Sequence, residues 1–242
     1  MEMKLQVIMA ILCLALLMWV DAANAQSTYS LSVSRHDDTP ALSAADVRVI
    51  LEDASMMLQK NASHVDTDDD HACNVTFTLK GPISNFASTK GPAVIETEHD
   101  RDAVHKVVSN VGGVNVHVKV VNEIKFCRPG AGQFAGCSFP IEFHSIIVVH
   151  PKKHRNPDNF SGPPLDKYPD HLLWAHEFGH LTGLGHRLGH QNPEDRRALM
   201  TGCPLNKVFS DVPDARVQVN KRECGCLRSG LGSCELPPPH GC

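Results

Sequence analysis

Polar and apolar residues alternate from Thr28 to Val33, as in a strand with one buried face. From Ser43 the period changes to the three- and four-residue spacing of an amphipathic helix that extends to Gln59. Ser43, with Asp46 three positions later, has the form of a helix N-cap. The apolar positions of this helix are Val47, Ile50, Leu51, Ala54, Met57 and Leu58. The pattern therefore predicts a helix packed on a sheet.

Three more segments have the composition of strands. Asn74 to Leu79 and Val114 to Val121 are rich in β-branched residues and alternate, and Ser145 to Val149 is a short continuous apolar run suited to a buried strand. Gln133 to Phe139 is a candidate edge strand. We expect these segments to complete the sheet.

Two polar stretches predict irregular structure. The segment 66–70 resembles the start of a calcium loop, but His71 replaces the required glycine and Phe77 the required glutamate, so we interpret it as a solvated turn. The stretch from His150 to Asp170 contains five prolines, which predicts a long surface loop.

The N-terminus has the form of a cleaved signal peptide. Leu5 to Val20 is apolar and is followed by Ala23-Asn24-Ala25, a small-x-small pattern that predicts cleavage after Ala25. A membrane anchor is the alternative, but the run barely reaches the roughly 17 residues that span a bilayer. We expect residues 1–25 to be removed and the mature protein to be secreted, or periplasmic in a bacterial host.

The cysteine count agrees with secretion. Of nine cysteines one, Cys13, lies in the apolar run, which leaves eight (9 minus 1), an even number typical of an oxidising compartment. The eight are Cys73, Cys127, Cys137, Cys203, Cys224, Cys226, Cys234 and Cys242. Among the 105 pairings that eight cysteines allow, we predict only Cys127 with Cys137, which flank a turn-rich stretch.

The segment 204–242 is predicted to be a cysteine-rich extension. Five of the eight cysteines lie from Cys203 onward, together with a run of three prolines, so we expect cross-links to replace a conventional core there. A second zinc site at Cys224, Cys226 and Cys234 is the alternative. Structural zinc sites usually have wider cysteine spacing, which disfavours it.

Composition and charge argue against a disordered chain but exclude few classes of function. The chain has 242 residues, 42% of them hydrophobic, with 23 Lys and Arg against 27 Asp and Glu. We therefore expect a folded domain with neither nucleic acid nor, after signal cleavage, a membrane as its partner. Sequons at Asn61, Asn74 and Asn159 would matter only in a eukaryotic host.

The candidate metal-binding and catalytic residues lie in one segment near residue 180. His171 to Leu184 is predicted to be a helix with Asp170 as its N-cap, which places His176 and His180, four apart, on one face. Zinc accepts three nitrogen ligands and keeps a fourth position open for water. Glu177, beside the first ligand, is placed to take a proton from that water.

Three further residues, Gly183, His186 and Met200, make the evidence for a metal site more specific. Gly183 can adopt a positive φ, ending the helix and turning the chain so that His186 approaches the same metal. Met200 follows in Ala198-Leu199-Met200. His190 rivals His186 as the third ligand, but its spacing is less favourable. His144, His150 and His171 are expected to have surface or hydrogen-bonded core roles.

His176-Glu177-x-x-His180-x-x-Gly183-x-x-His186 followed by a Met-turn resembles the signature of the metzincin metallopeptidases. The resemblance implies that the three histidines bind zinc, that Glu177 is the general base, and that Met200 lies beneath the metal. It also implies an α+β zincin-like catalytic domain, here residues 26–203, with a twisted mixed sheet, a backing helix and an active-site helix.

The subfamily is unassigned. The residue after the third histidine is Arg187, which fits no subfamily that we can name. Ala198-Leu199-Met200 is similar to a matrixin turn, yet a matrixin-type cysteine switch is absent. Gly136 to Pro140 faintly resembles the pappalysins. No tyrosine follows Met200, so a downstream tyrosine of the astacin or serralysin kind is absent.

We therefore expect a secreted zinc endopeptidase whose peptide or protein substrate lies extended along the strand near Gln133 to Phe139. A catalytically silent zinc-containing binding or inhibitory module is the alternative, and Glu177 discriminates against it because such a module need not keep the base. A small structural disulfide protein would explain the tail but would leave the histidine motif without a reason.

Overall fold

The structure is a computed structural model that describes residues 26–59, 72–129, 134–139, 141–151, 170–186, 199–200 and 219–234. The predicted signal peptide, the turn at 66–70, most of the proline-rich loop and His190 lie outside these ranges. So do Cys13, Cys203, Cys242, Asn61 and Asn159.

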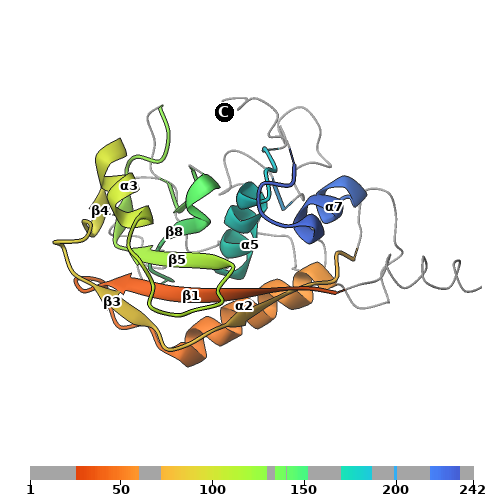
Figure 1. The fold of residues 1–242 in the computed structure, drawn as a ribbon, viewed down its shortest axis with the longest axis horizontal. Coiled ribbons are helices and arrows are strands. Elements are labelled where there is room, and N and C mark those ends of the chain that lie inside the picture. The colour runs from red at the N-terminus through yellow and green to blue at the C-terminus, as the bar shows by residue number, and fades with distance from the viewer. Residues whose placement is uncertain are drawn as a thin grey trace, which may run out of the picture.

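A six-stranded mixed sheet forms the centre of the fold (Figure 1). The strand order in this sheet is β2-β1-β5-β8-β7. A further short strand, β3, pairs with the C-terminal end of β1, after the part of β1 that pairs with β2. Every pair is parallel except β7 with β8. The strands are β1 (Ser27–His36), β2 (Val75–Leu79), β3 (Ser84–Phe86), β5 (Val116–Val121), β7 (Gly136–Cys137) and β8 (Ser145–Val149).

The predicted strands are confirmed. Ser145–Val149 has the predicted bounds, whereas β1 extends three residues beyond Val33. The candidate edge strand is present but short, because only Gly136–Cys137 pairs with β8, while Phe134 forms an isolated bridge to Ile124. A second small sheet pairs β4 (Val94–Ile95) with β6 (Glu123–Ile124).

Helix α2 (Ala44–Gln59) is the predicted backing helix. All six apolar positions that define its face are buried. The Asp46 amide donates to Ser43 Oγ at 3.1 Å and the Ser43 amide to Asp46 Oδ2 at 3.2 Å, so the predicted N-cap is confirmed. Because its apolar stripe is continuous, the helix buries one face and leaves Val49 and Met56 exposed on the other.

The sheet separates two cores. Val116, Val118 and Val120 of β5 pack with α2, α5 (Asp170–Leu181) and α7 (Lys221–Ser229), whereas Val121 packs with α3 (Glu98–His105) on the opposite face. This is the two-residue period of a strand whose faces are both covered. In Figure 1, α3 and α7 lie on opposite sides of α5. A short 3₁₀ helix (Ile141–Phe143) precedes β8.

The tail is tied to the body of the domain. Cys73, just before β2, is bonded to Cys224 of α7, and Cys226 is bonded to Cys234. These bonds exclude the alternative of a zinc site at Cys224, Cys226 and Cys234. The predicted Cys127–Cys137 disulfide is confirmed. Besides these cross-links α7 contributes Leu227 to the main core, so residues beyond Cys203 take part in its packing.

No described helix is long and apolar enough to cross a bilayer. The boundary drawn at Cys203 between domain and extension stays a prediction.

Removal of the Cys73–Cys224 bond should destabilise the protein more than removal of Cys226–Cys234. The first bond joins residues 151 apart and the second residues 8 apart. Because a cross-link that closes a longer loop removes more entropy from the unfolded chain, we expect losses of about 4–5 and about 2–3 kcal/mol in the free energy of unfolding. Chemical denaturation of the two double-alanine variants measures both, and equal losses would contradict the expectation.

Candidate metal centre

Helix α5 carries the histidine motif, and its ends differ slightly from the prediction. It begins at Asp170, so this residue is the first helical residue and not the N-cap, and it ends at Leu181 and not at Leu184. The Leu184 amide donates to the Gly179 carbonyl and the Gly183 amide to the His180 carbonyl, which is the Schellman arrangement. Gly183 has φ +95°, so the predicted glycine turn is confirmed.

The turn brings three histidines together. The Nε2 atoms of His176 and His180 lie 3.1 Å apart, and His186 Nε2 lies 3.1 Å from the first and 2.9 Å from the second. His176 is buried, and the other two are partly buried. Two nitrogens bound at 2.0–2.1 Å to one tetrahedral ion are about 3.3 Å apart, so the three atoms have the spacing of a ligand set.

Hydrogen bonds fix which ring nitrogen carries the proton in two of the rings. His176 Nδ1 lies 2.7 Å from the Leu199 carbonyl and His180 Nδ1 lies 2.8 Å from the Leu184 carbonyl. A carbonyl only accepts, so both Nδ1 atoms donate, and in the neutral rings both Nε2 atoms present lone pairs. Two facing lone pairs cannot bond to each other. A cation between them satisfies both, and this donor set fits a zinc ion.

Burial favours the neutral form of these rings. It lowers the pKa of His176, and it lowers that of His180 strongly, with the neighbouring His176 and His186 adding to the effect. The pKa of His186 is lowered to about 3, first by burial and then by His176. Neutral imidazoles are the form that binds metal, so the group needs no proton release near neutral pH.

Leu199 and Met200 pack against α5 near the histidine group. Both are buried, and the Leu199 carbonyl is the acceptor for His176. The Met200 sulfur packs so closely on Gly179 that a Cβ at that position would overlap it. Gly179 lies between His176 and His180 on α5, so Met200 contacts the helix at the level of the two histidines.

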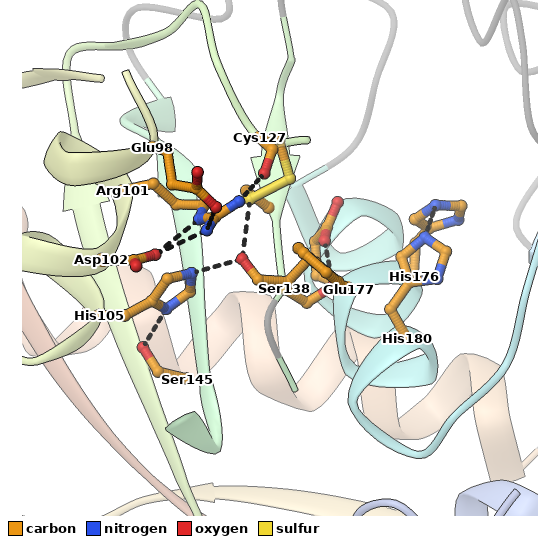
Figure 2. The surroundings of a disulfide bond; sticks show 12 residues. Glu98, Arg101, Asp102, His105, Cys127, Ser138, Ser145, His176, Glu177 and His180 are labelled. Atoms are coloured by element: carbon orange, nitrogen blue, oxygen red, sulfur yellow. Dashed lines mark hydrogen bonds and ion pairs between the residues drawn. A yellow bond between two sulfur atoms is a disulfide. The ribbon is translucent and has the colours of Figure 1, made fainter. Parts of the chain in front are cut away.

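Glu177 is buried on the side of α5 that contacts β7. Ser138 Oγ donates to Glu177 Oε2 at 2.9 Å, and Figure 2 shows the two side chains meeting beside His176 and His180. Burial raises the pKa of Glu177 to about 7, while the Ser138 hydrogen bond and the charge of Arg128 act in the opposite direction. A Cβ at Gly136 would lie 2.5 Å from Glu177 Oε1.

The tail holds the end of α5. The Gly232 amide donates to the Leu181 carbonyl at 2.8 Å, and the Cys234 amide to the Thr182 carbonyl at 2.9 Å. A Cβ at Gly183 would overlap the Cys234 carbonyl, so glycine is needed there for space as well as for its φ. The Cys226–Cys234 bond ties this contact to α7.

The structure thus brings together His176, His180 and His186, with Glu177 and Met200 adjacent. The contacts of Ser138 and Gly136 with Glu177, and the capping role of the tail, were not predicted from the sequence. The segment 133–139 was predicted as an edge strand, but nothing in the sequence indicated a bond to Glu177. Of the other histidines, His144 is exposed and His150 and His171 are buried, and none of these belongs to the group.

Comparisons with known proteins assign no family. No protein-family model and no curated protein matches the chain. A solved structure of mirolysin in complex with compound 9 aligns with 84% of this chain and 92% of its own, at 15% identity and a TM-score of 0.46. Mature mirolysin of Tannerella forsythia with a cleaved peptide aligns over 85% and 92%, at 13% identity and a TM-score of 0.45.

Proposed function

We propose that this chain is a secreted zinc-dependent endopeptidase of the metzincin type. The observation that carries the proposal is the convergence of His176, His180 and His186, with the tautomers of the first two fixed, beside a buried glutamate. A zinc ion held by these three histidines would supply Lewis acidity, which lowers the pKa of a bound water to about 7 and polarises a carbonyl. We place Met200 beneath the metal, as in the Met-turn that the sequence resembles, because its sulfur lies against Gly179 between His176 and His180 on α5.

Glu177 acts as the general base. Its carboxylate has about four acceptor positions, so the bond from Ser138 leaves room for a proton from the attacking water. As the water oxygen bonds to the scissile carbon, Glu177 takes that proton, and it delivers the proton to the amide nitrogen as the carbon–nitrogen bond breaks. Burial raises the pKa of Glu177, which favours a carboxylate that can hold the proton between the two transfers.

The substrate would be an extended peptide beside β7. This strand ends the main sheet and pairs on one side with β8; the described residues place no strand on its other side. A peptide pairing there would extend the sheet by one strand next to Glu177. Residues 26–203 would form the catalytic domain and 204–242 the cysteine-rich extension. A signal peptide would direct export of the protein, and its disulfides would form in an oxidising compartment, so the enzyme would act outside the cell or in the periplasm.

Metal removal tests the proposal. Incubation with a zinc chelator should abolish hydrolysis of a quenched peptide library, and one equivalent of Zn²⁺ per chain should restore it. Mg²⁺ should not, because it prefers oxygen ligands. Metal analysis and the hydrolysis rate are measured on the same samples. Hydrolysis by the metal-free protein would contradict the proposal, and full zinc without hydrolysis would favour the silent binding or inhibitory module.

A further inference from the structure

We propose that Ser138 is a positioning residue for Glu177, held in place by the Cys127–Cys137 cross-link and by the side chains of α3 behind it. The inference rests on the proposed function, because it concerns the orientation of the proposed base. It adds a residue and a supporting structure that lie outside the histidine motif.

The carboxylate of Glu177 is fixed at both of its oxygens. Oε2 accepts the Ser138 hydroxyl at 2.9 Å, and Oε1 lies against Gly136, where even a methyl group would come within 2.5 Å. Both side chains are buried, with exposed fractions of 4% for Ser138 and 6% for Glu177. A hydrogen bond between a hydroxyl and a buried carboxylate is charge-assisted, and so it selects one rotamer of a side chain that is otherwise free to rotate.

The disulfide fixes the backbone that carries Ser138. Cys137 precedes it directly and is bonded to Cys127, and both cysteines are buried. Arg101, exposed to only 1%, donates from Nη1 to the Cys127 carbonyl at 2.7 Å. Its guanidinium also pairs with Asp102 and Glu98 on the same helix, which keeps it directed at that carbonyl (Figure 2).

On the other side of Ser138, His105 holds the carbonyl of Phe139. His105 Nε2 lies 3.2 Å from that carbonyl and therefore donates, which leaves Nδ1 to accept the Ser145 hydroxyl at 3.1 Å. Burial and the charge of Arg101 lower the pKa of His105 to about 4, so near neutral pH the ring is neutral and keeps this tautomer. The residues on both sides of Ser138 are thus anchored to α3 or to the disulfide.

This arrangement predicts a specific kinetic effect. Without the Ser138 hydroxyl, Glu177 keeps its place on α5 but is no longer held in one rotamer. Misplacement of a catalytic group by about 1 Å costs on the order of 10²-fold in rate, and loss of an outer hydrogen-bonding partner about 10–100-fold. The expected loss falls on kcat, because Ser138 orients the base and does not bind the substrate.

The experiment compares Ser138→Ala, Ser138→Thr and Ser34→Ala with the unaltered zinc-loaded protein. Ser34 is the matched control, since it is also a buried serine and its hydroxyl is bonded to Ser84, but it lies on β1 away from the site. We expect Ser138→Ala to lose about 10–100-fold in kcat with KM within about twofold, and Ser138→Thr to recover part of the loss because it keeps the hydroxyl. Zinc content should stay at one per chain, and Ser34→Ala should keep its kcat.

A second readout needs no catalysis. In the metal-free protein, the Tm losses of Ser138→Ala and Glu177→Ala should not add in the double variant, because each removes the same bond. The losses of Ser34→Ala and Glu177→Ala should add.

The outcomes separate the two proposals. The positioning role would be wrong if the unaltered protein is active and Ser138→Ala keeps its kcat. It would also be wrong if the Tm losses of Ser138→Ala and Glu177→Ala add. Both outcomes leave the peptidase proposal intact. No hydrolysis by the unaltered zinc-loaded protein would overturn the proposed function, and the positioning role with it.

Discussion

Glu177→Gln should keep zinc and fold but lose peptide hydrolysis by about 10²–10⁴-fold, the typical contribution of a general base. Gln has nearly the same size, and its amide oxygen can still accept the Ser138 hydroxyl, so the local packing is preserved. What it lacks at neutral pH is a carboxylate that can take the proton of the attacking water. The measurements are kcat/KM on a quenched peptide, zinc content and circular dichroism.

Glu223→Gln is the matched control. Glu223 is buried to the same extent as Glu177, each with 6% of its surface exposed, and it closes the capping box at the start of α7. Because Gln also functions in a capping box, this variant should keep both stability and turnover. If Glu177→Gln with full zinc turned over as fast as the unaltered protein, the proposed role of Glu177 would be wrong. If the unaltered protein were equally inactive, the silent module would be favoured.

Local periodicity made much of the fold predictable. The six apolar positions of α2 were identified because helical spacing places them on one face, and Ser145–Val149 because a strand covered on both faces is apolar throughout. The Cys73–Cys224 bond had no such signal, since its residues are 151 apart and any pairing was equally compatible with the cysteine count. The length of β7 was overestimated, because the extent of its pairing with β8 sets that length and the strand propensity of the segment does not.

The same distinction holds at the site. His176 and His180 converge through helix geometry alone, and Gly183 supplies the turn that adds His186, so the sequence contains this part of the group. Ser138 reaches Glu177 across 39 positions of the chain, and the tail caps α5 from residues 232 and 234. These contacts depend on how β7 and the tail pack on α5, which no local pattern records.

His186→Ala should release zinc, whereas His190→Ala should not. The Nε2 atom of His186 completes the triangle with His176 and His180 at 2.9–3.1 Å, and its removal leaves two nitrogens for an ion that needs at least three protein ligands in catalytic sites. The fall in zinc affinity should exceed the 10–100-fold typical of partners outside the ligand set. His190 lies outside the described residues, and its dispensability stays a prediction.

Competition with a chelator of known affinity measures zinc binding in both variants, and His144→Ala serves as a control because His144 is exposed and stands apart from the group. Circular dichroism of the metal-free proteins separates loss of a ligand from loss of the fold. Retention of zinc by His186→Ala together with its loss from His190→Ala would mean that the third ligand had been misassigned. The turn at Gly183 would then be explained by its close packing against Cys234 alone. The three-residue spacing from Gly183 to His186 would not identify a metal ligand.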